Sequence, residues 1–249
     1  MTSHNERNRT MPTHSLLFRV KPGSEARVAE ILAGYDRPPT VIDDETRLLR
    51  TTVFMHGTVV VRAMDNEGSM QKVAAHVSRQ PQIQAAEQAL NPHLVEPRDL
   101  GDPASMAAFF RRAMMQCLVD RRIPIQPGDA ETTITRHALL YPLRPGTGDA
   151  ADGVFQAGGD PPPRAGGTRL HSTTVFRHED TVVRLFEISG DLDEAIEHLV
   201  RAAALQSAGQ GLAEFLDAGV DLTSQDGLRS FFHQQLMSVV TDRRAVQVA

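Results

Sequence analysis

The stretch Thr46-Arg-Leu-Leu-Arg-Thr-Thr-Val-Phe-Met-His-Gly-Thr-Val-Val-Val-Arg62 decides the fold, because it recurs as Thr168-Arg-Leu-His-Ser-Thr-Thr-Val-Phe-Arg-His-Glu-Asp-Thr-Val-Val-Arg184. The two stretches are identical at 11 of 17 positions without a gap, at an offset of 122 residues. Residues 99–122 and 221–244 continue that offset with 8 identities in 24 positions, and residues 14–24 parallel 137–147 at an offset of 123. Solenoid repeats are shorter, about 20–50 residues. The chain is therefore a tandem duplication of one small domain.

Length and composition fit this reading. The chain has 249 residues, of which 41% are hydrophobic, so that two domains, 14–122 and 123–249, are expected after a polar, disordered tail at 1–13. A net charge of −5 gives no electrostatic reason to expect nucleic acid or an anionic membrane surface. A single cysteine excludes an intrachain disulfide, and we find neither a secretory signal nor an apolar run of membrane-spanning length. We expect a cytoplasmic protein.

Periodicity predicts the elements of the first repeat. Alternation and turn residues indicate strands, and apolar residues spaced by three and four indicate amphipathic helices. The expected order is a strand at 16–20, a helix at 25–35, a hairpin of strands 47–55 and 58–64 around His56-Gly57, helices at 70–77 and 83–90, a fourth strand within 93–100, and an added helix whose stripe runs from Met106 to Leu118. The order β-α-β-β-α-β is that of a ferredoxin-like unit.

The second repeat departs from this plan at one place. Residues 144–167 contain seven glycines and four prolines, and we predict a long mobile loop there instead of the first helix. The hairpin at 169–188, the second helix and the last helix, with its stripe from Leu228 to Val240, are expected to be retained.

The fold class follows from how such a unit is covered. Its two helices shield one face of the sheet, while the other face still carries apolar side chains that need a partner. Two sheets packed face to face meet this need. We therefore expect an α+β protein in which tandem duplicated ferredoxin-like units, each with an extra C-terminal helix, form an intramolecular dimeric α+β barrel.

Several blocks of the chain resemble the SchA/CurD-like proteins of aromatic polyketide and spore-pigment biosynthesis. They are Leu-Phe-Arg-Val-Lys-Pro-Gly-Ser-Glu at 17–25, Arg-Leu-Leu-Arg-Thr-Thr-Val-Phe at 47–54, and the Val-Asp-Arg-Arg and Thr-Asp-Arg-Arg endings at 119–122 and 241–244. The resemblance implies a tailoring role in type II polyketide biosynthesis, with a polycyclic aromatic substrate. Relatives of the same barrel fold include cofactor-independent monooxygenases and polyketide cyclases.

Cofactor-free oxygenation of an aromatic ring requires a base, a dry apolar pocket and donors for the substrate's oxygens. Histidine suits the role of base because its pKa lies near neutrality. The chain has ten histidines, and three pairs are equivalent in the two repeats. The pairs are His14/His137, His56/His178 and His76/His198, and the repeated arginines are Arg47/Arg169 and Arg62/Arg184.

One histidine breaks the symmetry, since His171 stands where the first repeat has Leu49. The second repeat also has Gly158 in place of Tyr35 and Ala151 in place of Val28, which predicts less filling of its core. We therefore expect the functional cavity in the second repeat, beneath residues 144–167. His171 is the first candidate base, Arg169 and His198 are helpers, and His178, His56 and His76 are further candidates.

Other sites and other functions are weighed against this one. Turn exposure accounts for His56 and His178 without any catalytic role, and the arginines suit structural ion pairs equally well. His178-Glu179-Asp180 lacks the spacing of a zinc site, and no glycine-rich nucleotide motif follows a strand, so neither a metal nor a cofactor is expected. A hydroxylase using molecular oxygen is the leading hypothesis. A cyclase or aromatase, and a non-catalytic subunit that binds the polyketide or scaffolds the cyclases, remain alternatives, and the oligomeric state stays open.

Overall fold

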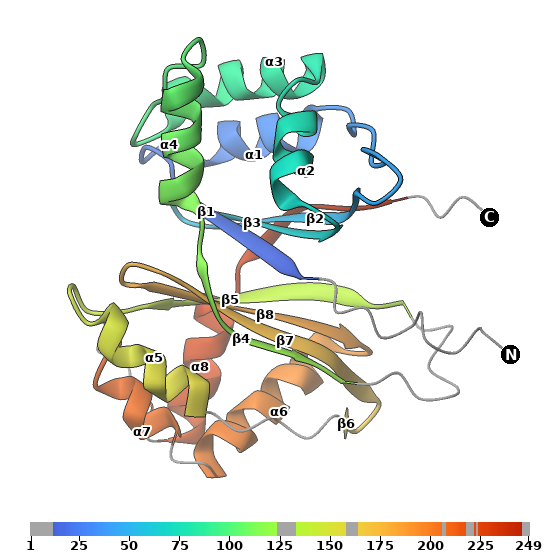
Figure 1. The fold of residues 1–249 in the computed structure, drawn as a ribbon. Helices are drawn as coiled ribbons and strands as arrows, with labels where there is room; N and C mark the ends of the chain where they lie inside the picture. Colours follow the sequence, from blue (N-terminus) through green and yellow to red (C-terminus); the bar gives the residue numbers. More distant parts are fainter. Residues whose placement is uncertain are drawn as a thin grey trace, which may run out of the picture. The chain divides into compact units, whose positions relative to one another are not determined.

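The computed structural model describes residues 12–123, 133–157, 164–205, 208–217, 222 and 224–245. Two compact units are present: Met1–Met114 with Val239–Ala249, and Met115–Ser238. Each unit is an α+β structure in which helices cover one face of an antiparallel sheet (Figure 1). The predicted class of two repeated α+β units is confirmed. The packing of one sheet against the other stays a prediction.

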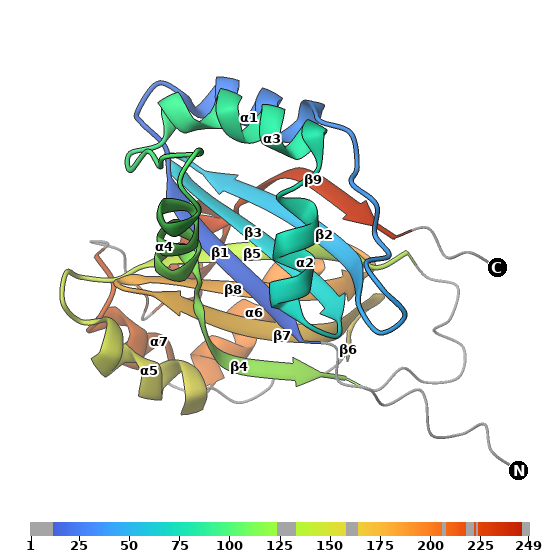
Figure 2. The same ribbon diagram turned by 45° about the horizontal axis from the view of Figure 1, so that its top comes forward.

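The first unit contains a four-stranded sheet in the order β1-β3-β2-β9. Figure 2 views this sheet with helices α2 and α4 in front of its strands. The elements are β1 Thr13–Arg19, α1 Glu25–Gly34, β2 Arg47–His56, β3 Val59–Glu67, α2 Met70–Val77, α3 Pro81–Leu90, a 3-10 turn Asn91–His93, α4 Pro103–Ala113 and β9 Ser238–Arg244. The strand, hairpin and helices predicted between residues 16 and 90 are thus confirmed.

The second unit repeats this plan with the strand order β4-β7-β8-β5 and a short β6 beside β7. Its elements are β4 Gln116–Arg122, β5 Thr135–Pro142, α5 Gly148–Ala157, β6 Arg164–Ala165, β7 Thr168–His178, β8 Thr181–Ser189, α6 Leu192–Leu205, α7 Ala208–Ala213 and α8 Gln225–Gln235. Both β2 and β7 shift register at equivalent places, between Leu48 and Arg50 and between Leu170 and Ser172.

The fourth strand of each sheet is not where periodicity placed it. Residues 93–100 form no strand, and the predicted last helix stops at Ala113, so Cys117 and Leu118 belong to β4. In the same way, α8 ends at Gln235 and Val239 and Val240 belong to β9. An apolar run of this length fits a helix and a strand equally well. These two predictions were wrong.

The last strand of each repeat belongs to the sheet formed by the other repeat. Strand β4, from the first repeat, pairs with β7, and strand β9, from the second repeat, lies beside β2. An ion pair between the buried Arg50 and the partly exposed Asp242 joins β9 to β2. Arg50 donates from Nε and Nη2 to the two carboxylate oxygens of Asp242, both at 2.7 Å, and Thr52 donates to the same carboxylate at 2.9 Å. The repeat boundary in the sequence and the boundary between compact units therefore differ.

The predicted loop at 144–167 contains a helix instead. Residues 148–157 form α5, and residues 158–163 lie outside the described part of the chain. The carboxylate of Asp180, in the β7–β8 turn, accepts hydrogen bonds from the backbone N–H groups of Gly146 and Gly148 at 2.8 and 2.9 Å, which anchors the start of α5. Phe155 is buried against Tyr141, with ring centroids 5.4 Å apart. A long-range anchor and a packed face outweigh the low helix propensity of glycine.

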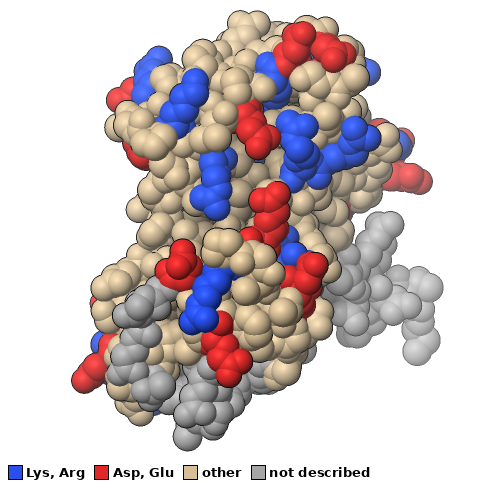
Figure 3. All heavy atoms as spheres, turned by 90° about the vertical axis from the view of Figure 1, so that its left-hand side faces the viewer, with Lys and Arg blue, Asp and Glu red and all other residues tan. Residues whose placement is uncertain are grey.

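The predicted tail falls largely outside the description. Residues 1–11 are not described, and Thr13 already belongs to β1. On the face seen in Figure 3, acidic and basic side chains are interspersed rather than separated by sign. Among the described residues, no helix is long and apolar enough to cross a membrane.

Candidate functional site

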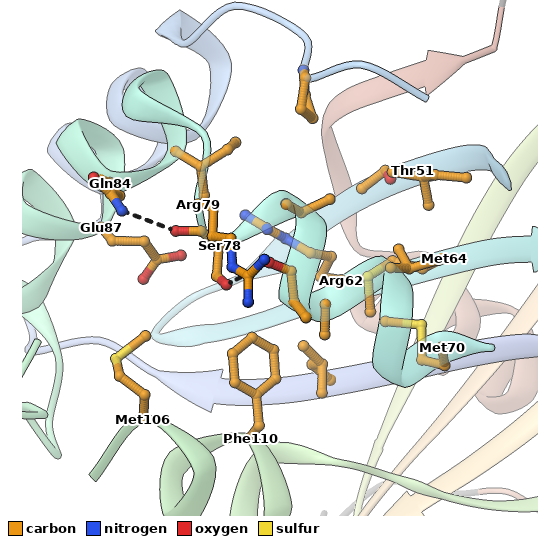
Figure 4. A pocket seen from close by; sticks show the side chains of 18 of the residues that line it. Thr51, Arg62, Met64, Met70, Ser78, Arg79, Gln84, Glu87, Met106 and Phe110 are labelled. Carbon is orange, nitrogen blue, oxygen red and sulfur yellow. Dashed lines mark hydrogen bonds between the residues drawn. The ribbon is translucent and has the colours of Figure 1, made fainter. Parts of the chain in front are cut away.

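A cavity of about 1120 Å³ lies in the first unit, between the sheet and its helices. Its volume is slightly above the range of about 300–1,000 Å³ that is usual for ligand pockets. The sheet contributes side chains from β1, β2 and β3, and helices α2, α3 and α4 form the opposite walls (Figure 4). The lining side chains used below are His14, Arg37, Arg62, Met64, Met70, Val73, Ala74, Val77, Arg79, Glu87, Met106, Phe110, Met114 and Arg243.

The walls are mostly apolar and rich in sulfur. Met64, Met70 and Met106 and the ring of Phe110 surround the interior in Figure 4. Methionine is flexible and polarisable, and its sulfur makes favourable contacts with aromatic rings. Such walls fit a flat aromatic ligand better than a small polar one.

The sheet wall carries one histidine, His14, which lies on β1 opposite Met64 of β3. Burial lowers the pKa of His14 below its usual 6.5, and the carboxylate of Asp65 opposes this shift in part. The imidazole is therefore neutral at pH 7 and can accept a proton. Arg62 lies on the same strand and face as Met64, two residues away, which makes it a diagonal neighbour of His14.

Arg62 is one of several arginines that line the cavity. Its Nε is shut off from solvent and has no hydrogen-bond partner in the described part of the chain. The nearby carboxylate of Glu87 is held by Arg98 instead. Burial and the charge of Arg62 lower the pKa of Arg98 to about 10, so Arg98 is still protonated at neutral pH. Two guanidiniums and one carboxylate leave this corner with an excess positive charge.

Arg98 is fixed by its surroundings. Its guanidinium carbon lies 3.9 Å from the centre of the Phe109 ring. The side chain of Asn91 donates to the backbone carbonyl of Arg98 at 2.8 Å and accepts from its N–H at 2.9 Å. The ring contact and the backbone hydrogen bonds therefore hold Arg98 beside Glu87.

In the second unit, the equivalent positions are filled differently. Phe186 replaces Met64, and its ring stacks on His137, the counterpart of His14, with centroids 5.5 Å apart. Ile196 replaces Ala74 and is fully buried. Leu199 replaces Val77, whereas Ala195 is smaller than its counterpart Val73. At three of these four positions the second repeat carries the bulkier side chain, and the ring of Phe186 covers one face of the His137 imidazole.

This cavity is in the other repeat from the one predicted. The prediction rested on the smaller residues that replace Tyr35 and Val28 in the second repeat. Helix α5 nevertheless forms there, and it buries Ala151 and Phe155. Ala151 and Phe155 therefore fill part of the space that we expected to be open, while residues 158–163 lie outside the described part of the chain, and a cavity beneath them stays a prediction.

The six predicted site residues are dispersed, and none lines the cavity of the first unit. His171 is buried in β7, with its Nε2 2.9 Å from Oγ of Ser189, and Arg169 of the same strand lies opposite Ser189. The structure thus brings Arg169 and His171 together around one serine. The others are half-buried: His56 and His178 end strands beside turns, and His76 and His198 lie on α2 and α6. Their catalytic roles stay predictions.

The sequence comparison identified His14 and Arg62 as repeated residues, but neither was among the predicted site residues. The sequence does distinguish the two repeats beside Glu87, because the residue before Asp99 is Arg98 whereas the residue before the equivalent Asp221 is Val220. Arg98 therefore has no arginine counterpart in the second repeat. No cluster of three or more metal-ligating side chains occurs within the described ranges.

Comparisons with known proteins give a consistent family. A model of the SchA/CurD-like domain matches residues 11–122 and again 134–245. The chain is 42% identical over 94% of its length to polyketide synthase CurD of Streptomyces cyaneus, and 38% identical over 93% to a 42.8 kDa protein in the whiE locus of Streptomyces coelicolor. It spans 64% and 58% of the lengths of these two proteins.

A solved structure of an anthrone oxidase-like protein aligns with 96% of this chain and 94% of its own, at 11% identity and a TM-score of 0.43. That TM-score is too low to carry an argument about this chain.

Proposed function

Because the chain belongs to the SchA/CurD-like family, we propose that it is a tailoring protein of aromatic polyketide biosynthesis, and specifically a hydroxylase that oxidises a polycyclic aromatic intermediate with molecular oxygen and without a cofactor. The cavity of the first unit is the proposed site. The observation that carries the proposal is the combination of a cavity of about 1120 Å³, methionine and phenylalanine walls, and a neutral histidine on the wall.

His14 is the proposed general base. Its neutral imidazole removes a proton from an acidic C–H or O–H group of a hydroxylated anthrone or naphthol-like substrate. The substrate carbanion then transfers an electron to dioxygen, and the two radicals combine to a peroxide. Loss of water from the protonated peroxide of an anthrone leaves a carbonyl group. One oxygen atom of O₂ ends in the product and the other in water, and the substrate supplies all of the electrons.

The rest of the cavity supports this chemistry. The apolar walls exclude water from the carbanion, and the arginines of the lining stabilise its negative charge in a medium of low dielectric constant. Arg62 is the nearest such cation to His14 that the strand register places on the same face. A covered imidazole such as His137 is not available to a ligand in this way.

The test is oxygen uptake by the purified protein with an anthrone, comparing His14→Gln with the matched variant His137→Gln. We expect His14→Gln to lower turnover by about 100-fold or more and His137→Gln to leave it close to wild type. The variant His171→Gln tests the competing base. A loss confined to His171→Gln would transfer the role to that residue.

The same assay separates the alternative functions. A cyclase or aromatase converts its substrate equally well without oxygen, so full conversion under anaerobic conditions would refute the hydroxylase. Tight binding without any conversion would instead indicate a non-catalytic polyketide-binding subunit.

The pH profile gives a second check on the base. Since the pKa of His14 in the folded protein is below 6.5, kcat/KM should be constant above that value and fall only at lower pH. An acid limb that lies at or above 6.5 would contradict His14 as the base.

A further inference from the structure

We propose that Arg243 is a positioning residue of the cavity in the first unit, where it holds Tyr35 as an end wall remote from His14 and so limits the length of the ligand. The ligand is then an elongated system of about four linearly fused rings, longer than an anthrone. The inference rests on the proposed function in that it uses the same cavity. It goes beyond that function by naming the dimension of the substrate that is selected and the residues that select it.

The sheet wall of the cavity is a row of side chains that crosses the strands. His14 of β1 lies opposite Met64 of β3, and Met64 lies opposite Thr51 of β2. Residues opposite each other in an antiparallel pair share a face of the sheet, so the three side chains form one row. All three line the cavity, and Figure 4 shows Thr51 and Met64 on their neighbouring strands.

Strand β9 extends this row to the other edge of the sheet. Asp242 is bonded to Arg50, and the backbone N–H of Ala245 donates to a carbonyl oxygen of β2 at 2.7 Å. These bonds on either side place Arg243 beside Thr51, at the end of the row. Arg243 and Ala245 both line the cavity, although the sequence that carries them belongs to the second repeat. The site of the first unit is therefore built from both repeats.

The length of the row favours an elongated ligand. The strand order β1-β3-β2-β9 makes three inter-strand steps between His14 and Arg243. At a spacing of about 4.8 Å between neighbouring strands, the two ends of the row are about 14 Å apart. A ligand whose reacting ring lies at His14 therefore has room for further rings toward Arg243. Linear fusion keeps these rings along the row, whereas angular fusion turns them out of it.

The far end of the row carries a tyrosine that Arg243 contacts. Tyr35 is the C-cap residue of α1 and lines the cavity. The guanidinium carbon of Arg243 lies 4.1 Å from the centre of the Tyr35 ring. Nη2 of the same arginine donates to the backbone carbonyls of Ala33 at 2.9 Å and Leu32 at 3.4 Å, in the last turn of α1. One side chain thus fixes both the end of the helix and the ring that follows it.

The second unit keeps the arginine but has no equivalent ring. Arg121 is the counterpart of Arg243, and it donates to the carbonyl of Gln156 in α5 at 3.4 Å. The residue that stands in place of Tyr35 is Gly158, which has no side chain to form a wall. Arg121 is therefore a matched control, since it contacts the helix while the ring that Arg243 contacts has no counterpart.

The experiment measures the binding of linearly fused hydroxyquinones with three, four and five rings, which are already oxidised and are not turned over. The chain has no tryptophan, so ligand fluorescence is measured against a low protein background. We expect the affinity of the wild-type protein to rise from three to four rings and to fall by about 10-fold or more at five, because the fifth ring collides with Tyr35. Tyr35→Gly, which copies the second repeat, should remove the fall, and Tyr35→Phe should keep it.

Variants of the arginine test its positioning role. Arg243→Met keeps an unbranched side chain but loses the charge and the donors, so the Tyr35 ring is released and the fall at five rings should become smaller. Arg243→Lys keeps the charge without the planar stacking and should restore part of the fall. Arg121→Met should keep the wild-type profile. Unchanged affinity for the three-ring compound shows that each variant is folded with its cavity intact.

The possible outcomes separate this inference from the proposed function. Affinity that rises through five rings in the wild-type protein would overturn the length limit, while oxygen uptake with an anthrone tests the hydroxylase independently. A wild-type profile in Tyr35→Gly would overturn Tyr35 as the wall, and a wild-type profile in Arg243→Met would overturn the role of Arg243. Binding of none of the three compounds would contradict the cavity as the site, and the proposed function with it.

Discussion

Exchanging one residue between the repeats tests whether the cavity of the first unit is open space that the second unit fills. Ala74 on α2 lines the cavity, and its counterpart on α6, Ile196, is fully buried. We predict that Ala74→Ile and Ile196→Ala change stability in opposite directions. The first places a side chain in existing space, and the second creates new space in a packed core.

The magnitudes follow from the number of carbon atoms. Isoleucine adds three carbons to Ala74, and burying them contributes up to about 2.4 kcal/mol at about 0.8 kcal/mol per methylene. Lost rotamer freedom costs about 0.5–1 kcal/mol and the lower helix propensity of isoleucine about 0.4 kcal/mol. Ala74→Ile should therefore stabilise by about 1 kcal/mol. Ile196→Ala should destabilise by about 2–5 kcal/mol, since it combines lost burial with a new cavity.

The assay is denaturant unfolding followed by circular dichroism, paired with ligand-binding titrations. Ala74→Ile should also weaken binding of the aromatic ligand by about 10-fold or more, because one added side chain obstructs the cavity, while Ile196→Ala leaves the affinity unchanged. If Ala74→Ile destabilised the protein as much as Ile196→Ala does, the space beside Ala74 would not be open, and the reasoning would fail. Unaltered binding by Ala74→Ile would place the ligand elsewhere.

Two further predictions concern stability. Asp242→Ala removes the carboxylate that pairs with Arg50 and should destabilise by about 2–3 kcal/mol in urea unfolding. The equivalent Asp120 accepts a long hydrogen bond of 3.4 Å from Thr174, so Asp120→Ala should cost less than about 1 kcal/mol. Equal costs would argue against the ion pair as the anchor of β9. Hydrogen bonds from the backbone N–H of Gly146 and its neighbours lower the pKa of Asp180 below 3.8, so its stabilisation of α5 is present above that pH and lost as the pH falls through the lowered pKa. Asp180→Asn should weaken that pH dependence in acid titrations of stability, and an unchanged acid limb would refute the anchoring role.

The fold could be predicted from the sequence wherever the signal was local or repeated. The identity between residues 46–62 and 168–184 established the duplication, and alternation around His56-Gly57 established the hairpin. The apolar stripe from Met106 to Leu118 gave a helix that was too long, because its last residues belong to β4. Apolar residues at this spacing fit a helix or a strand, and the pairing with a neighbouring sheet decides between them.

Long-range contacts account for the other errors. Nothing near Gly148 in the sequence indicates that Asp180, in a distant turn, anchors the helix there. The filling lost at Ala151 is replaced in part by Phe155 from the next turn of α5, which the comparison with Val28 and Tyr35 did not show. A functional site in the second repeat stays a prediction. The repeat comparison identified His14 as one of a pair of equivalent histidines. It could not show that His14 lines a cavity, because this depends on its neighbour Met64, which is Phe186 in the second repeat and stacks there on His137.

The most direct measurement of the central claim is a crystal structure of the protein with a hydroxylated anthrone bound in the absence of oxygen. The account predicts one ligand in the first unit, with its rings against Met64 and Phe110 and a ring carbon or hydroxyl within hydrogen-bonding or proton-transfer reach of His14. A ligand bound instead in the second unit, beside His171 and Arg169, would contradict the account.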